Sequence, residues 1–449
     1  MSAKKAQNSK LQPHAQSFLD SLRDFLTPAI WKQANETRCS RRKSSRWGTQ
    51  PLVMALLMMT WCCGDSQAER FETAKGFTAV CLSKRRRPGA SVQGFQKALA
   101  KLPTRVLRVV AAGIRRRLLQ LFDLKSDGFI VFGCDGSSME TPRVAELEKR
   151  LDPPLKKNAR QQVWVTALVH LRTGLLWAWR LGKGYSRERD HLRALLSTLP
   201  AAALVVADAG FNGYELAQAI TAAGVSFLIR MSGKDKLYTQ ERLVLRRFRE
   251  GVVLLWPLEM QKNGLPPLRM RLIRIRGEKK RRDVWLLTNV LDAQRLTAAT
   301  AGRYYRWRWE NEGLFRTFKR TLAKVRLLSR TVREIHREAE GALLATQLLL
   351  AQGERGVRTG SSTSAARCSP RKVLLAIRDV IMGKIGIRKK GAFQKRLAKA
   401  LREERQRTSS KVSRDWPRRV KPKPSKPPSF LMLTDEQKEL ANQLLGLAA

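Results

Sequence analysis

Five short apolar segments between residues 128 and 231 constrain the fold of this chain more than any other feature. Three of them, GFIVFGC, VWVTALVH and LLWAWR, are rich in β-branched and aromatic residues and are predicted strands, with a tight LRTG turn between the last two. A predicted helix separates them from ALVVAD, a continuous apolar run typical of a buried parallel strand, and another helix precedes SFLIRM. Three strands, helix, strand, helix, strand is the order of an α/β sheet. The segments span residues 128–134, 163–170, 175–180, 203–208 and 226–231.

The regions on either side of this block have different patterns. Residues 1–124 predict a basic helical region, and the several runs of Lys and Arg within it favour DNA binding. Residues 232–290 are rich in predicted strands, and a long helix is predicted from about 293 to 325. Helices are predicted to continue through 331–416. Residues 417–449 predict a proline- and lysine-rich linker followed by a short helix that opens with a Thr–Gln capping box.

The charge balance indicates the kind of partner. The chain has 88 Lys and Arg against 37 Asp and Glu, so its net charge is +51. So many like charges destabilise a compact chain unless a polyanion neutralises them, and nucleic acid is therefore the predicted partner, with a membrane surface as the weaker alternative. The start of the chain lacks the apolar core of a signal peptide, and the most apolar run, 51–63, is too short to cross a bilayer. Six cysteines without a CxxC pair predict neither a disulfide framework nor a zinc site, which fits a reducing cytoplasm.

The segment YYRWRWENEGLFRTFKR, residues 304–320, combines acids, bases and aromatic residues. If it forms a straight helix with 100° between residues, four polar side chains fall within an arc of about 60°. A separate arc of about 100° is mostly apolar, so the helix is predicted to bury one face and to present the other for chemistry. The four polar residues are Tyr305, Arg308, Glu312 and Lys319.

The neighbours of these four residues divide between the two faces. Arg316 and Trp309 join the polar face, whereas Glu310 lies away from it, so Glu312 is the acid of interest. A structural interpretation remains open at this point, because Arg308 and Glu312 also have the i,i+4 spacing of an ordinary surface ion pair.

Two aspartates elsewhere in the chain favour the chemical interpretation. Asp135 and Asp208 each stand at the end of a predicted strand with a glycine close behind, although Asp is depleted in strands. At the carboxyl end of a strand in an α/β sheet, such a residue faces the ligand crevice. With Glu312 they would form an all-oxygen site, which suits two Mg²⁺ or Mn²⁺ ions and the in-line transfer of a phosphoryl group. A strongly basic protein with such a site is a candidate DNA strand-transfer enzyme or nuclease.

In these residues the chain resembles the DDE transposases of bacterial insertion sequences of the fourth family. The Tyr-x2-Arg-x3-Glu-x6-Lys signature of that family is reproduced at Tyr305, Arg308, Glu312 and Lys319. Asp135 in CDGSS and Asp208 in ADAGF stand where the family has its first and second aspartates, and LLTN at 286–289 matches the strand before its signature helix. The resemblance covers about 128 to 325.

The resemblance implies a ribonuclease-H-like α/β catalytic domain with a β-rich insertion between the second Asp and the Glu. Helical N- and C-terminal regions would flank this domain. The catalytic core would then comprise residues 125–231 and, with the signature helix, residues 291–330, interrupted by the insertion at 232–290. The basic helical region 1–124 would precede it, and the helical region 331–416 and the linker with its terminal helix, 417–449, would follow it.

The resemblance also implies a function. Asp135, Asp208 and Glu312 would be the catalytic metal ligands for two Mg²⁺ or Mn²⁺ ions, while Tyr305, Arg308 and Lys319 would grip the DNA backbone near the cut. Trp309 on the helix or Trp256 in the insertion would stack a flipped base, although an ordinary core position is the simpler interpretation of Trp256. Arg316 would contribute to DNA binding.

The expected protein is a DNA transposase that binds double-stranded transposon ends as a homodimer, cleaves them and joins them to target DNA. It would act in the bacterial cytoplasm at the nucleoid, without a membrane. It would need no nucleotide cofactor, in line with the lack of a GxxxxGK(S/T) loop. A transposase-derived DNA-binding protein and a ribonuclease-H-like nuclease without strand transfer are the alternatives. A basic RNA-binding protein comes last, because no aromatic RNA motif is present.

Overall fold

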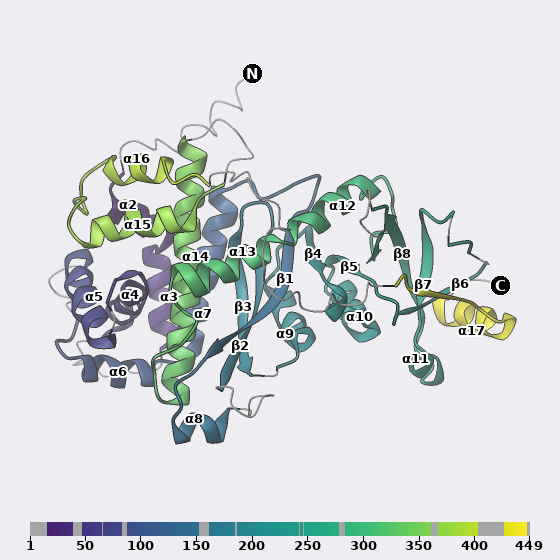
Figure 1. Ribbon diagram of the computed structural model, residues 1–449, viewed down its shortest axis with the longest axis horizontal. Helices are drawn as coiled ribbons and strands as arrows, with labels where there is room; N and C mark the ends of the chain where they lie inside the picture. The colour runs from purple at the N-terminus through teal and green to yellow at the C-terminus, as the bar shows by residue number, and fades with distance from the viewer. Residues whose placement is uncertain are drawn as a thin grey trace, which may run out of the picture.

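A computed structural model of the 449-residue chain describes residues 16–38, 47–64, 66–82, 88–151, 161–184, 186–241, 243–245, 247–277, 283–360, 367–402 and 426–446. Helices gather at one end of the molecule and a twisted sheet extends from them to the other end (Figure 1). The predicted linker at 417–429 lies outside the described residues as far as residue 425. No helix among these ranges is long and apolar enough to span a bilayer.

A single mixed sheet runs through the molecule, so the fold is mixed α/β. The strands of the described ranges lie side by side in the order β10-β6-β7-β8-β9-β5-β4-β1-β2-β3. Their bounds are β1 Ile130–Glu140, β2 Gln162–His170, β3 Leu175–Lys183, β4 Ala203–Ala207, β5 Ser226–Arg230, β6 Lys236–Thr239, β7 Glu250–Leu255, β8 Leu268–Ile275, β9 Val284–Thr288 and β10 Ser429–Met432.

The five apolar segments between residues 128 and 231 form neighbouring strands, which confirms their prediction. β2 runs antiparallel to its two neighbours β1 and β3, so β3, like β4 and β5, has the same direction as β1. The crossover helices that make parallel pairing possible are α9 (Glu188–Leu195) and α10 (Tyr214–Ala222). The predicted end of the first strand was wrong, because β1 does not stop near residue 134 but continues to Glu140 along β2.

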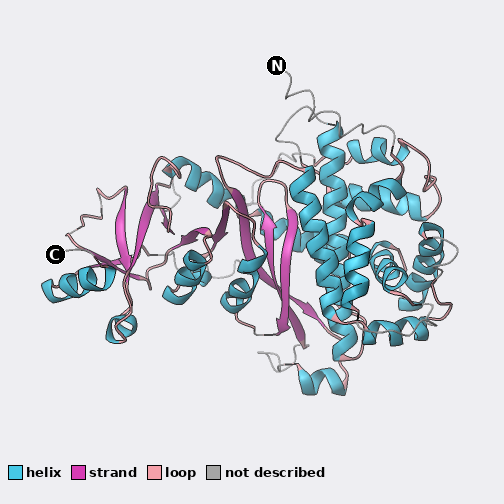
Figure 2. Cartoon of the chain, turned by 180° about the vertical axis from the view of Figure 1, so that it is seen from behind, coloured by secondary structure: helices cyan, strands magenta, loops and turns pink. Residues whose placement is uncertain are grey.

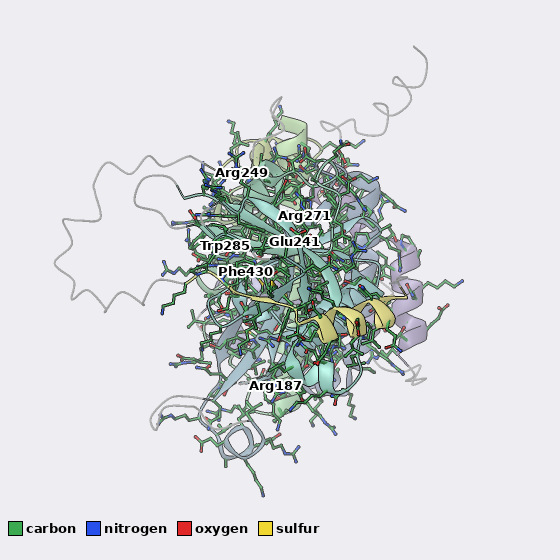
Figure 3. All side chains as sticks on the ribbon, turned by 90° about the vertical axis from the view of Figure 1, so that its right-hand side faces the viewer. Arg187, Glu241, Arg249, Arg271, Trp285 and Phe430 are labelled. Atoms are coloured by element: carbon green, nitrogen blue, oxygen red, sulfur yellow. The ribbon has the colours of Figure 1, made fainter. Side chains whose placement is uncertain are left out.

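Strands β6 to β9 extend the same sheet away from the helices. β9 pairs antiparallel with β5, and β8, β7 and β6 follow in turn. The helix α17 (Asp435–Leu445) opens with the predicted capping box between Thr434 and Gln437, and the strand β10 before it pairs in parallel with β6. Figure 3 shows Phe430 of β10 beside Trp285 of β9, and the centroids of their rings are 6.0 Å apart.

One long helix joins the helical end of the molecule to the sheet. α14 (Val332–Gly360) packs on β3 and on the helices of the N-terminal region (Figure 2). Trp61 donates its indole N–H to the carbonyl of Ala345 on α14, and Gln347 of α14 donates to the carbonyl of Trp177 on β3. These contacts place one continuous core between the sheet and the helices. The helices around α14 are α2 Phe18–Phe25, α3 Pro28–Thr37, α4 Thr49–Trp61, α5 Gln67–Cys81, α6 Val92–Lys101, α7 Thr104–Leu121, α15 Pro370–Ile381 and α16 Ala392–Ala398.

The predicted continuous helix at 293–325 is divided into three parts. These are α12 (Ala298–Trp307), α13 (Glu310–Arg316) and the π-helical turn η5 (Thr317–Thr321). The parts face different cores, because Tyr304 of α12 is buried in a cluster with residues of β1, β4, β5, β8 and β9, whereas Phe315 and Phe318 are buried in the main core. A straight helix with one apolar face cannot serve both, so the backbone turns at Arg308 and Trp309.

Candidate active site

Asp135 lies within β1, and Asp208 directly follows the parallel neighbour β4. The parallel pairing of β1 with β4 ends at Gly133 opposite Val206, so two residues further along the same register brings Asp135 beside Asp208 and on one face. Each carboxylate accepts a hydrogen bond of 2.9 Å from a backbone N–H just ahead of it, Asp135 from Gly136 and Asp208 from Gly210. These glycines let the backbone come close to the carboxylates and hold them in place.

The third predicted acid faces the same place from α13. Glu312 is exposed in the first turn of that helix. The pKa of Asp135 is raised, first by burial and also by the charges of Asp208 and Glu312. The N–H of Gly136 and the charge of Arg308 act in the other direction. The structure therefore brings the three predicted acids within electrostatic reach of one another.

The three carboxylates still lie apart. Across the ranges that the structure describes, no three carboxylate, histidine or cysteine side chains are close enough to hold a metal ion as they stand. The donor set nevertheless fits a hard cation, because all of its ligand atoms are oxygens. The carboxylates repel one another, and a bound cation would remove that repulsion. The exposed Glu312 is the member that is free to approach.

A fourth acid, which the sequence interpretation missed, lies beside the aspartates. Glu188, the first residue of α9, places its carboxylate against the backbone of Gly136: Oε1 would be 1.8 Å from a Cβ atom at that glycine. Burial and the charges of Asp135 and Asp208 together raise the pKa of Glu188 to about 7, against the hydrogen bond from Trp164, which lowers it. In the sequence Glu188 stands among the charges of SRERD at a helix start, where acids are common, so no local signal marked it.

Arg308 occupies the turn between α12 and α13, between two aromatic rings. Its guanidinium carbon lies 5.4 Å from the ring centroid of Tyr305 and 5.5 Å from that of Trp309. The ion pairs of the described residues do not include one between Arg308 and Glu312, so the structural interpretation of that spacing finds no support. The buried Nε of Arg308 and the buried hydroxyl of Tyr305 have no hydrogen-bond partner within the described part of the chain. Both are donors that a phosphate can satisfy.

The two tryptophan candidates have opposite environments. Trp309 has 61% of its surface exposed, as a residue that stacks on a ligand needs. Trp256 is fully buried and donates its indole N–H to the carbonyl of Leu265, which confirms the core interpretation.

The remaining signature residues lie further along the segment. Lys319 is half-buried in η5, and burial lowers its pKa while the nearby charge of Glu140 raises it. Arg316 is exposed and lines a cavity on another side of α13. Glu310, predicted to lie away from the site, forms ion pairs with Arg367 (2.6 Å) and Arg402 (3.2 Å) instead.

Known proteins similar to this chain include one protein family and solved structures. Residues 130–348 match the family model of a transposase DDE domain, which supports a DDE transposase family for this chain. No curated protein matches its sequence. Among solved structures, the piggyBac transposase synaptic complex with hairpin DNA is similar with a TM-score of 0.43 and 12% identity, over 89% of this chain and 88% of that one.

Proposed function

We propose, on the premise that residues 130–348 are a transposase DDE domain, that the chain binds the two ends of a DNA element, cleaves them and joins them to target DNA. The observation that carries the proposal is that Asp135 and Asp208 follow the paired part of β1 and β4, and that the charges of Asp208 and Glu312 both act on Asp135. A protein that only binds DNA gains nothing from three anions placed next to phosphate.

The finer features of the family are part of the same proposal. The strand order β3-β2-β1-β4-β5, in which β2 alone runs against the other four strands, supports a ribonuclease-H-like core. The strands β6 to β9 support a β-rich insertion at 232–290 within the core formed by 125–231 and 291–330. The spacing of the signature residues supports the fourth family of bacterial insertion sequences. A bacterial, nucleoid-associated site of action would follow.

Asp135, Asp208 and Glu312 would hold two Mg²⁺ or Mn²⁺ ions, with Glu188 next to them. Bound cations of this kind activate a water or a 3′-hydroxyl for in-line attack on phosphorus and stabilise the departing oxygen. The chain itself holds the DNA: Arg308 offers a bidentate fork to a phosphate and the Tyr305 hydroxyl a single hydrogen bond. Lys319 adds a positive charge, and the exposed ring of Trp309 offers a base a stacking surface.

Double-stranded DNA is the proposed partner, both as element ends and as target. The net charge of +51 supports it, because Lys and Arg release the counterions of DNA when they contact its phosphates. Because two ends have to be joined in concert, we propose a homodimer on paired ends. The helical regions 1–124 and 331–416 would supply further contacts with the ends, and no nucleotide cofactor is required.

The test is incubation of the protein with Mg²⁺ and DNA that carries the flanks of its own genomic copy. We expect flush or nicked element ends and, with added target DNA, joined products. Cleaved ends without joining would indicate a nuclease, and bound but uncut DNA would indicate a DNA-binding protein derived from a transposase.

A further inference from the structure

A second polar cavity lies beside the signature segment, on the side of Glu310. It has a volume of about 190 Å³ and lies between α13 with η5, the turn that joins β2 to β3, and the start of α15. Successive residues of a helix are 100° apart, so Glu310 and Glu312 point in nearly opposite directions and the cavity is distinct from the acid site. Its polar lining residues are Thr173, Glu310, Arg316, Thr317, Thr321, Arg367, Ser369, Arg371 and Arg402.

The charge of the cavity is strongly positive. Four arginines line it against one carboxylate, which leaves a net charge of +3 (4 − 1). Arg367 and Arg402 face Glu310, but only Arg402 has hydrogen-bond geometry to it, and the buried Nη1 of Arg367 lacks an acceptor despite its 2.6 Å distance. Arg316 and Arg371 form no ion pair with any residue that the structure describes. The cavity therefore holds more donors than its single carboxylate can satisfy.

The start of α15 adds to this preference for an anion. The 12-residue helix begins at the cavity with Ser369 and Pro370, and the Ser369 side chain does not cap the helix. The positive end of the helix dipole attracts anions. Thr321 also lines the cavity. The four arginines, with the helix start beside them, form a donor set that suits a tetrahedral phosphate.

We propose that this cavity binds a backbone phosphate of DNA, and so fixes a stretch of duplex beside the signature segment. The proposal rests on the proposed function, since it assigns the cavity to the same DNA substrate. Arg316 connects the two places, because it lines the cavity and follows Glu312 by one helical turn. A duplex held by Arg316 and Arg371 therefore passes close to the acid site.

The first test measures anion binding without DNA. The melting temperature of the protein is compared in sodium phosphate and in sodium chloride at equal ionic strength. We expect phosphate to raise it, and the Arg316→Ala and Arg371→Ala variants to lose most of that increase. The double variant Arg388→Ala/Lys389→Ala removes two exposed charges outside the cavity and should keep it. Equal increases in all variants would overturn the proposal.

A gain of binding complements this loss. Glu310→Gln removes the competing carboxylate and frees Arg367 and Arg402, so the phosphate-dependent increase should become larger than in the wild type. An unchanged or smaller increase would show that the arginines serve only to hold Glu310. This variant keeps the proposal testable where an arginine variant fails to fold.

The second test measures DNA binding in the Glu312→Gln background, where cleavage does not interfere. The logarithm of the affinity falls with the logarithm of salt concentration by about 0.9 per phosphate contact. We expect Arg316→Ala/Arg371→Ala to reduce this slope by about one relative to the wild type, because one phosphate contact is lost, and to weaken binding about a hundredfold. Arg388→Ala/Lys389→Ala should change either quantity far less.

Together, the two tests distinguish DNA from free phosphate as the ligand of the cavity. They also test the cavity separately from the proposed transposition chemistry. A response to inorganic phosphate with an unchanged DNA slope would mean a site for free anions and would overturn the DNA proposal. A reduced DNA slope in a protein that never cleaves DNA would leave the cavity assigned and the proposed transposition chemistry wrong.

Discussion

Two glutamates only two residues apart in α13 have different environments and are expected to differ in function. Glu312 is exposed and acts on Asp135, whereas Glu310 is held by Arg367 and Arg402. We predict that Glu312→Gln, which removes a charge without changing size, abolishes Mg²⁺-dependent cleavage and leaves DNA binding intact. Glu310→Gln is the matched comparison: it alters the pairing of Arg367 and Arg402 but none of the three acids, so cleavage at saturating DNA should fall far less than in Glu312→Gln. Equal losses in the two variants would contradict the assignment of Glu312.

Arg308 is predicted to bind a phosphate of the DNA and not to bind the metal ions. With Arg308→Ala, we expect assembly on the element end to weaken about tenfold, because a bidentate contact to phosphate is lost. Arg308→Lys should not restore it, because an ammonium group cannot form that fork. Gel-shift titration of end DNA measures the effect, and calorimetry with Mn²⁺ should show metal binding nearly unchanged. An Arg308→Ala protein that pairs and cuts ends at full rate would make the residue structural.

The buried His170 predicts how stability depends on pH. Burial lowers the pKa of His170 to about 3, and its ring nitrogens are hydrogen-bonded to the Leu124 carbonyl (2.9 Å) and the Thr173 hydroxyl (2.7 Å). Between about pH 6.5 and 3, the imidazole of His170 is protonated in the unfolded chain but neutral in the folded chain. The free energy of unfolding should therefore fall as the pH decreases over this range.

Urea titrations at several pH values test this dependence. His170→Gln should lose up to one proton's share of the slope, about 1.4 kcal/mol per pH unit. His191 and His336 also have pKa values lowered by burial, so part of the slope should remain. An identical slope in wild type and variant would contradict the assignment.

Among the elements, the strands were predictable and the signature helix was not. Each of the five core strands could be recognised in the sequence from a short, mostly apolar run, because a strand buried on both faces contains few polar residues. The signature segment contains neither Pro nor an unusual turn residue at its bend, so a helical wheel at 100° treated it as straight. The bend arises from two separate cores, which is tertiary information.

The candidate site shows the same division between local and tertiary information. Asp135 and Asp208 could be singled out because carboxylates are rare after apolar strands. Glu188 could not, because only the packing of α9 over Gly136 brings it to the aspartates. The cavity beside Glu310 was equally hidden, since its arginines come from segments far apart in the chain.

The contact of α13 with β1 depends on a glycine. A Cβ atom at Gly133 would lie 2.5 Å from Oδ1 of the fully buried Asn311 and 2.6 Å from Leu171. We predict that Gly133→Ala lowers the free energy of unfolding by about 1–3 kcal/mol and slows cleavage, because α13 must shift away from the aspartates.

Denaturant unfolding and cleavage assays provide the check. Gly386→Ala is the matched control, since its Cβ would come no closer than 3.4 Å to a neighbour, and it should change little. Adding Asn311→Ala to Gly133→Ala should cost less than the sum of the two single changes, because the shorter side chain removes part of the clash. Strict additivity would show that the two residues do not meet.

For the molecule as a whole, charge is the dominant property. With a net charge of +51, affinity for DNA of any sequence should fall steeply as salt increases, and about six phosphate contacts would cost about a thousandfold between 50 and 200 mM salt. Fluorescence anisotropy with unrelated duplexes measures this slope. A flat response to salt would point to a partner other than a polyanion.

The pairing of β10 with β6 can form only late in synthesis, and until then one edge of the sheet is uncovered. Thr239 and Leu431, which are hydrogen-bonded across this pair, are 192 positions apart in the chain. While a ribosome adds the residues between them, β6 is the outermost strand of the sheet, with backbone groups that any neighbouring nascent chain can pair with. A chain whose translation stalls before residue 429 therefore keeps an exposed edge strand. Such chains are expected to aggregate under conditions in which the full-length protein does not.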